Sequence, residues 1–304
     1  YDTPRAVSTG PNWAYLRIAE GCDNRCAYCV IPSLRGKFRS RTKESILEEA
    51  RLLAASGVKE LIIVAQDITR YGIDLYGKVC LTELLKELCK LDFCWVRLHY
   101  LYPELIDDEL IDEIASEDKI VKYLDIPIQH INDTILRRMN RRGTGEEIRA
   151  LFKKLRERIP GLVLRTSLIT GLPGEGEAEF EELCDFLREA KIERAGVFPY
   201  SPEEGTPAAL MPDRCSTEEA QRRAELCMEI QAEIMDGFAE TFIGRELDVL
   251  VMGREPDGTP WGRSEYDSPD IDSRVIFSGD AAPGDMVRVR IDSVDDGELI
   301  GEQI

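Results

Sequence analysis

Residues 15–29 read Tyr-Leu-Arg-Ile-Ala-Glu-Gly-Cys-Asp-Asn-Arg-Cys-Ala-Tyr-Cys, a short apolar run followed at once by three closely spaced cysteines. The run at 15–20 predicts a β-strand, so the cysteines lie in the loop that leaves it. Three thiolates this close in sequence can converge on one metal site if the loop curls around it. A [4Fe-4S] cluster normally takes four thiolates, so ligation by Cys22, Cys26 and Cys29 alone leaves one iron open to a substrate or cofactor.

Structural zinc and free thiols are the alternatives to such a cluster. A structural zinc site needs a fourth ligand, and the nearest choices, Cys80 and His99, are distant in sequence. The other cysteines show no second three-ligand spacing: Cys80, Cys89, Cys94, Cys184, Cys215 and Cys227. Cys184 lies on the apolar face of a predicted helix, which indicates a core position.

Short apolar runs alternate with amphipathic segments over the first two thirds of the chain. Beyond 15–20, strands are predicted at 60–65, 95–99, 123–126, 162–168 and 195–198. A helix is expected between Thr42, a suitable N-cap, and Gly57, a suitable C-terminal stop. Six such alternations predict an α/β fold with right-handed crossovers and a parallel sheet, either open and doubly wound or a partial barrel. In both architectures ligands bind at the carboxyl ends of the strands.

The pattern changes after a proline-rich stretch at 199–212. Ser216 and Glu219 form a plausible capping box for a long helix that ends near residue 240. Short runs at 246–252, 274–277, 286–291 and 298–301 then predict a small antiparallel β-barrel. We therefore expect two domains, residues 1–241 with a trailing linker helix and residues 242–304.

Composition restricts the function. The chain has 39 basic and 58 acidic residues, a net charge of −19, which argues against non-specific adhesion to nucleic acid or anionic lipid. Residues 242–304 carry 6 basic and 15 acidic side chains, which predicts either a solvated acidic surface or a face that binds a basic partner. No apolar run is long enough to span a membrane. Nine cysteines without a leader indicate reduced thiols and a cytoplasmic location, and the start at Tyr1 suggests a segment of a longer protein.

The Cys-x3-Cys-x-Tyr-Cys spacing after the first of six strands resembles the radical S-adenosylmethionine superfamily. The resemblance implies a partial (β/α)6 barrel in which the open iron binds S-adenosylmethionine, and one electron from the cluster cleaves this cofactor to a 5′-deoxyadenosyl radical. It places Tyr28 near the adenine, and Gln66 and Asp67 near the amino end of the cofactor. Arg165 and Ser167 alternate on one strand face, and with Gly171 they resemble the family's fifth-strand motif, which contacts the adenosine.

Further segments resemble the methylthiotransferases, with a TRAM-like final barrel: Ile31–Gly36, Tyr71-Gly72, Asp125–His130 and Tyr200–Thr206. Ile-Pro-Ser-Leu-Arg-Gly at 31–36 is similar to the RimO branch, which modifies the β-carbon of an aspartate in protein twelve of the small ribosomal subunit. The alternative is the MiaB branch, which modifies a tRNA adenosine. The acidic final barrel independently favours a basic ribosomal protein over tRNA as partner.

The resemblance also implies parts that these residues do not supply. Full-length members carry an N-terminal domain with a second [4Fe-4S] cluster involved in sulfur donation, and the radical step requires an electron donor. Arg35, Arg39 and Arg41 are candidates for orienting the substrate or the cofactor carboxylate, or else solvated charges. His99 and His130 follow strands and are either site residues or satisfied structural histidines. A binding module with structural zinc is the alternative from a different class.

Overall fold

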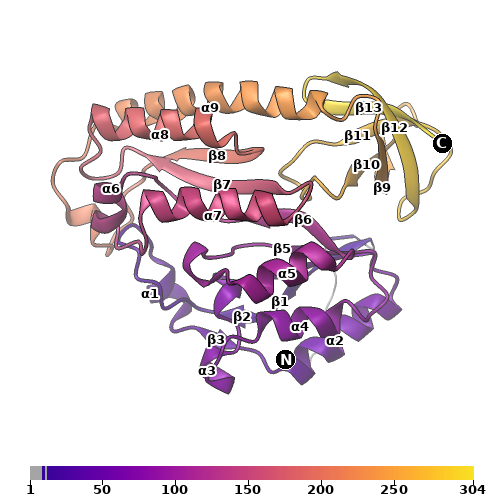
Figure 1. Ribbon diagram of the computed structural model, residues 1–304, viewed down its shortest axis with the longest axis horizontal. Coiled ribbons are helices and arrows are strands. Elements are labelled where there is room, and N and C mark those ends of the chain that lie inside the picture. Colours follow the sequence, from indigo (N-terminus) through magenta and orange to yellow (C-terminus); the bar gives the residue numbers. More distant parts are fainter. Residues whose placement is uncertain (1–8, 11) are drawn as a thin grey trace.

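A parallel sheet of six strands forms the larger part of the computed structural model, which describes residues 9–10 and 12–304. The strand order is β1-β4-β5-β6-β7-β8, so each strand lies beside the next one along the chain. The strands are β1 (Trp13–Arg17), β4 (Glu60–Val64), β5 (Trp95–Leu98), β6 (Ile120–Asp125), β7 (Val163–Thr170) and β8 (Arg194–Pro199). This confirms the predicted parallel sheet, in its partial-barrel form (Figure 1).

Helices cover the outer face of the sheet (Figure 1). The main ones are α2 (Lys43–Ala55), α4 (Leu81–Leu88), α5 (Asp108–Ser116), α7 (Gly145–Arg158), α8 (Glu177–Ala190) and α9 (Thr217–Glu240). Helix α2 begins as predicted, with the Thr42 side chain accepting a hydrogen bond from the Ser45 amide. Ser216 caps α9 in the same way through the Glu219 amide. None of the helices in the described ranges is long and apolar enough to cross a membrane.

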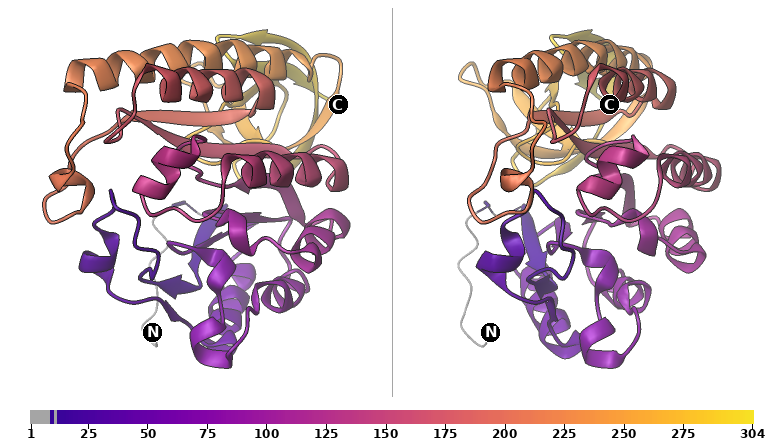
Figure 2. Two further views of the ribbon diagram at one scale, coloured as in Figure 1. Left: turned by 60° about the vertical axis from the view of Figure 1, so that its left-hand side comes forward. Right: turned by 90° about the vertical axis from the view of Figure 1, so that its left-hand side faces the viewer.

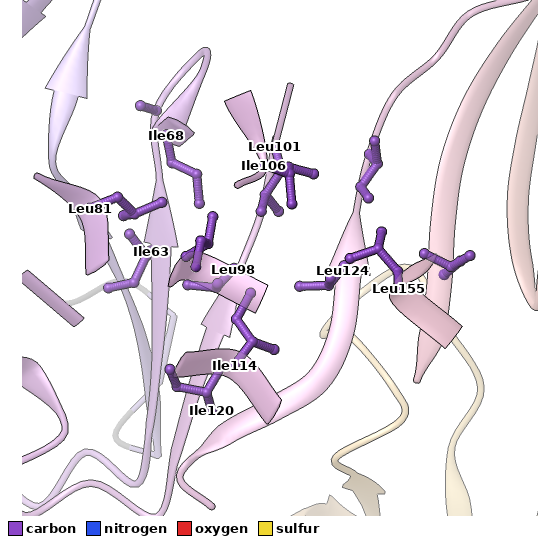
Figure 3. Packing of buried hydrophobic residues seen from close by; sticks show 14 of the residues in the cluster. Ile63, Ile68, Leu81, Leu98, Leu101, Ile106, Ile114, Ile120, Leu124 and Leu155 are labelled. Carbon is purple, nitrogen blue, oxygen red and sulfur yellow. The ribbon is translucent and has the colours of Figure 1, made fainter. Parts of the chain in front are cut away.

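The core lies between the sheet and these helices. Ile63, Leu98 and Leu124 come from neighbouring strands and pack toward Ile114 of α5 and Leu155 of α7 (Figure 3). All five are fully buried, and each contributes roughly 1.5–3 kcal/mol by leaving water. Side chains alternate along a strand, so the neighbours of Ile63, Leu98 and Leu124 within their own strands face the barrel interior.

Shorter elements shape the loops at the carboxyl ends of the strands. They are β2 (Ala19–Glu20), α1 (Ile31–Arg35), β3 (Arg39–Ser40), η1 (Ile68–Arg70), α3 (Ile73–Tyr76), η2 (Pro103–Leu105), α6 (Asp133–Arg138) and η3 (Ala208–Leu210). The two-residue strands β2 and β3 pair with each other in an antiparallel hairpin. This hairpin brackets the cysteine loop and α1.

The last 59 residues form a closed five-stranded barrel of β9 (Glu246–Arg254), β10 (Pro260–Ser264), β11 (Val275–Ser278), β12 (Met286–Asp295) and β13 (Glu298–Gln303). The prediction of an antiparallel barrel is wrong at one pair, since β11 and β13 are parallel. Up-and-down alternation cannot close a ring with an odd number of strands, so one parallel pair is required. Strand β10 was not predicted because Pro260 and Gly262 interrupt its pattern.

Strand β10 and the segment that follows it close the amino end of the larger barrel. Glu60, at the start of β4, accepts a hydrogen bond from Arg97 of β5 at 2.6 Å and another from Arg263 of β10. Arg194 of β8 donates to Asp267 at 2.8 Å. All these side chains are buried. Figures 1 and 2 show the small barrel at one end of α9, away from the cysteine loop and α1. Ligands must therefore enter at the opposite, carboxyl end of the strands.

Candidate functional site

Cys22, Cys26 and Cys29 lie in the loop between β2 and α1, at the carboxyl end of the barrel, and all three thiols are free. The loop begins at Gly21, which has a φ of +80°. A β-carbon added to Gly21 would lie only 2.2 Å from the Lys37 carbonyl oxygen. No other residue type fits so close an approach. The Cys22 amide donates to the Gly36 carbonyl at 3.1 Å. This hydrogen bond joins the start of the cysteine loop to the segment that precedes β3 of the hairpin.

Two distant segments hold the middle of the loop. The Ala27 amide donates to the Met139 carbonyl at 2.8 Å, and its carbonyl accepts from the Ala208 amide at 2.9 Å. The Asn140 side chain donates to the Arg25 carbonyl at 2.7 Å. The loop is therefore clamped between the end of α6 and η3, which keeps the three thiols at one edge of the barrel.

The thiols of Cys22 and Cys29 favour their protonated form. Burial raises the pKa of Cys22 to about 11 and also raises the pKa of Cys29. Only deprotonated thiols ligate metals, so a metal bound by these thiols would release protons, and its binding would depend on pH.

Three thiols in one loop are donors of the kind that hold an iron–sulfur cluster, whose usual protein ligands are Cys thiolates. Two thiolates on one zinc ion lie roughly 3.8 Å apart, whereas a cubane spreads its thiolates over separate iron corners. Within residues 9–10 and 12–304, no three His, Cys, Asp or Glu side chains have the spacing of a single-ion site. Three thiols are present in the loop, one fewer than a closed cluster takes.

Asp67 and Gln66 have different surroundings although they are adjacent. Asp67 is fully buried, caps η1 through the Thr69 amide at 3.1 Å, and accepts from the Asn24 side chain at 2.9 Å. Both of its oxygens are thus engaged, and it ties the cysteine loop to the end of β4. The Gln66 side-chain oxygen is buried without a hydrogen-bond partner, which leaves it open to a donor on a ligand.

The predicted cofactor-binding residues on and after β7 also differ in their surroundings. Arg165 donates to Asp125 at 2.9 Å, and Ser167 lies two residues along the same strand face. Gly171 has φ of +74°, and a β-carbon there would lie 2.4 Å from that of Ala220. The structure accounts for Gly171 by the close packing of α9 against this turn.

A cavity of about 190 Å³ lies beside the cysteine loop. Its lining residues are Tyr28, Gln129, Ile169, Phe198, Pro199, Tyr200 and Ser201. The Tyr200 hydroxyl is buried without a hydrogen-bond partner. Aromatic walls with few polar groups suit a planar ring that stacks and hydrogen-bonds at its edge. Of the residues predicted to contact the cofactor, Tyr28 lines this cavity.

Both histidines are buried in structural networks. His99 lies 3.1 Å from the Ser268 hydroxyl of the small barrel. His130 accepts from the Asn132 amide at 3.0 Å and has its other ring nitrogen 3.3 Å from Glu175. Burial, together with the charges of Arg97 and Arg165, lowers the pKa of His99 to about 3. The contact of His99 matches the satisfied-histidine interpretation, whereas the buried Nε2 atom of His130 has no hydrogen-bond partner among the described residues.

The three candidate arginines near the loop are engaged with the protein itself. Arg41 is buried and pairs with Glu49 at 2.6 Å. Arg35 pairs with Glu20 at 3.1 Å. Arg39 donates to the Lys37 carbonyl at 3.0 Å. The contacts of Arg41 assign it to the attachment of α2 to the sheet.

Tyr102 and Arg141 contact the loop without any local signal in the sequence. The Tyr102 hydroxyl lies 3.0 Å from the Cys26 sulfur, and an Arg141 nitrogen lies 3.9 Å from it. They stand 76 and 115 residues from Cys26 in the chain, so spacing could not reveal them.

Solved structures and family models agree with this architecture. The radical SAM superfamily model matches residues 16–187, and a TRAM domain model matches residues 243–304. The match to the structure of coproporphyrinogen III oxidase (HemN) from Escherichia coli, a radical SAM enzyme, covers 75% of this chain and 54% of the HemN chain. Its TM-score is 0.56, and the two sequences are 20% identical. The match to the structure of the radical S-adenosylmethionine methyltransferase TsrM from Kitasatospora setae covers 64% of this chain and 38% of the TsrM chain, with a TM-score of 0.55 and 20% identity. At these identities the likeness shows the fold alone.

Curated relatives place the chain more narrowly. The ribosomal protein uS12 methylthiotransferase RimO of Pelotomaculum thermopropionicum is 52% identical over 306 residues, 99% of this chain and 69% of the relative. That of Caldanaerobacter subterraneus subsp. tengcongensis is 49% identical over 302 residues, 98% of this chain and 69% of the relative. The chain therefore belongs to the radical SAM superfamily and, within it, to the RimO family of methylthiotransferases.

Proposed function

We propose that this chain binds a [4Fe-4S] cluster through Cys22, Cys26 and Cys29, and S-adenosylmethionine at its open iron, in order to methylthiolate an aspartate β-carbon of ribosomal protein uS12. The observation that carries the proposal is the set of three free thiols in one clamped loop at the open end of the barrel. The family relationship supports the same conclusion, since its curated members are named for this reaction.

The chain's own groups bind and orient the cofactor. Tyr28 lines the cavity beside the loop and offers its ring to the adenine. The unpaired Gln66 oxygen can accept a hydrogen bond from the cofactor's ammonium group, and the Tyr200 hydroxyl is a second open polar group. Asp67 supports the site by holding Asn24 of the loop. When bound, the cluster supplies the electron that cleaves the cofactor.

Anaerobic reconstitution tests the cluster and its ligands. We expect about four irons per chain and release of 5′-deoxyadenosine when dithionite and S-adenosylmethionine are added. Alanine substitution of Cys22, Cys26 or Cys29 should remove both, while Cys94→Ala, outside the loop, should remove neither. Zinc bound in place of iron, with no deoxyadenosine, would instead support the structural-zinc binding module.

We propose that the acidic small barrel binds the basic substrate protein. Asp267 and Asp272 are buried against the larger barrel and are not available. Asp295 and Asp296, at the tip between β12 and β13, are exposed. Charge attraction of this kind raises association rates and weakens with salt.

Binding of the full chain to uS12 and to tRNA distinguishes the two methylthiotransferase branches. We expect salt-sensitive binding to uS12 that weakens in the Asp295→Asn, Asp296→Asn double variant. Tighter binding to tRNA than to uS12 would favour the MiaB-type reaction and contradict the proposal.

We further propose that sulfur donation uses a second [4Fe-4S] cluster outside these 304 residues, and that a separate reductant supplies the electron. The support is that the curated relatives extend beyond the match, which covers 69% of the first two. Methylthiolated uS12 formed at full yield by this chain alone, after deoxyadenosine release is established, would contradict the second-cluster proposal.

A further inference from the structure

We propose that Tyr102 and Arg141 set the reduction potential of the cluster by stabilising negative charge on the Cys26 sulfur. This inference rests on the proposed function, because it takes Cys26 as a cluster ligand. In this inference Tyr102 and Arg141 act through the Cys26 sulfur and do not contact the substrate.

The geometry is specific to one of the three sulfurs. The Tyr102 hydroxyl lies 3.0 Å from the Cys26 sulfur, within donor reach, and an Arg141 nitrogen lies 3.9 Å from the same atom. The contact recorded for the Cys22 sulfur is with a carbonyl oxygen, that of Asn24 at 3.9 Å. Cys26 is also the most buried of the three, at 7% exposure.

Contacts with other parts of the protein hold the two side chains in place. The Arg141 guanidinium stacks on the Tyr102 ring at 4.1 Å and donates to the Pro127 carbonyl at 2.8 Å. The Tyr102 amide lies 3.4 Å from the Thr69 hydroxyl, which donates to Asp67. The pair is thus built into the same network that anchors the cysteine loop.

The Glu104 carboxylate lies close enough to Arg141 to interact with its charge, but the two are not directly paired. Arg141 is 8% exposed, its Nε has no hydrogen-bond partner, and it forms no ion pair with a carboxylate of the described residues. An unpaired buried cation is costly. A cluster ligated by Cys26 would add negative charge at the sulfur that the Arg141 guanidinium contacts at 3.9 Å.

Reduction adds one electron, and part of its charge resides on the ligand sulfurs. A fixed cation and a hydrogen-bond donor stabilise the reduced state more than the oxidised state, which raises the reduction potential. Removal of either group should therefore make the cluster harder to reduce.

Redox titration of the reconstituted chain, followed by electron paramagnetic resonance, tests this inference. Tyr102→Phe keeps the ring and removes only the hydroxyl, and Arg141→Met removes only the charge of a long side chain. We expect both to shift the midpoint potential to more negative values at full iron content, and Arg141→Lys to shift it less than Arg141→Met. The control is Arg142→Met, which removes an exposed neighbouring charge and should leave the potential unchanged.

The outcomes separate the two proposals. A wild-type midpoint potential in both Tyr102→Phe and Arg141→Met, with full iron content, overturns the inference and leaves the cluster assignment intact. Full iron content in Cys26→Ala shows that Cys26 is not a ligand, and both proposals then fail. If Arg141→Met does not load iron, Tyr102→Phe decides, because it changes neither charge nor ring packing.

Discussion

Replacement of Glu60 by glutamine tests whether the buried ion network fixes the small barrel against the larger one. Glu60 is fully buried between Arg97, 2.6 Å away and equally buried, and Arg263, which is 3% exposed on its side chain. Glu60→Gln keeps the size of the side chain and removes its charge, which leaves two buried guanidinium groups without a counter-ion.

The expected loss is large because removal of one partner from a buried ion pair costs about 3–5 kcal/mol. For 304 residues the entropy of unfolding near the midpoint is about 0.64 kcal/mol/K, so the melting temperature should fall by about 5–8 °C. Acid should act in the same direction. Burial opposes ionisation of Glu60, but Arg263 and Arg97 outweigh it and lower its pKa. Its contribution is therefore complete above the unfolded pKa of about 4.3 and is lost as the pH falls toward the folded value.

Scanning calorimetry of the chain measures the shift, and Glu83→Gln is the matched control. Glu83 also contacts two cations, Lys43 and Lys78, but on the surface, where solvent screens the interaction and the melting temperature should barely change. A triple variant with Glu60, Arg97 and Arg263 replaced by apolar residues should recover most of the loss, since no unpaired charge remains. An unchanged melting temperature in Glu60→Gln would refute the reasoning.

Two further predictions concern the cysteine loop and a buried histidine. Gly21→Ala should abolish iron loading because its β-carbon would meet the Lys37 carbonyl oxygen at 2.2 Å. The control, Gly205→Ala, has a similar φ of +81° and open space around it, so it should load iron normally. Equal iron loading in the two variants would contradict the steric argument. Burial, with Arg97 and Arg165, lowers the pKa of His99 to about 3, so its ring resonance should not titrate between pH 7.5 and 5. Because the unfolded value is about 6.5, its contribution to stability should decline as the pH falls from there toward 3, and His99→Gln should weaken that dependence.

Much of the fold was predictable because it depends on local patterns. The six parallel strands, the start of α2 at Thr42 and the start of α9 at Ser216 follow from alternation and capping, which act within a few residues. The two errors in the final barrel, the missing β10 and the assumed antiparallel order, concern which strands pair, and pairing depends on residues far apart in sequence. The division at residue 241/242 stays a prediction.

For the site, the sequence by itself determined where the three closely spaced thiols lie. Cys22, Cys26 and Cys29 fall within eight residues after the first strand, and this spacing predicts a cluster with an open iron. Only the tertiary structure decided what surrounds them. It brings Tyr102 and Arg141 to Cys26 across 76 and 115 residues, assigns Asp67 to anchoring and Gly171 to helix packing, and closes the far end of the barrel with Arg263 of the small domain. The reason is physical, since a thiol's reactivity follows its charge and burial, and both are set by groups that meet only when the chain folds.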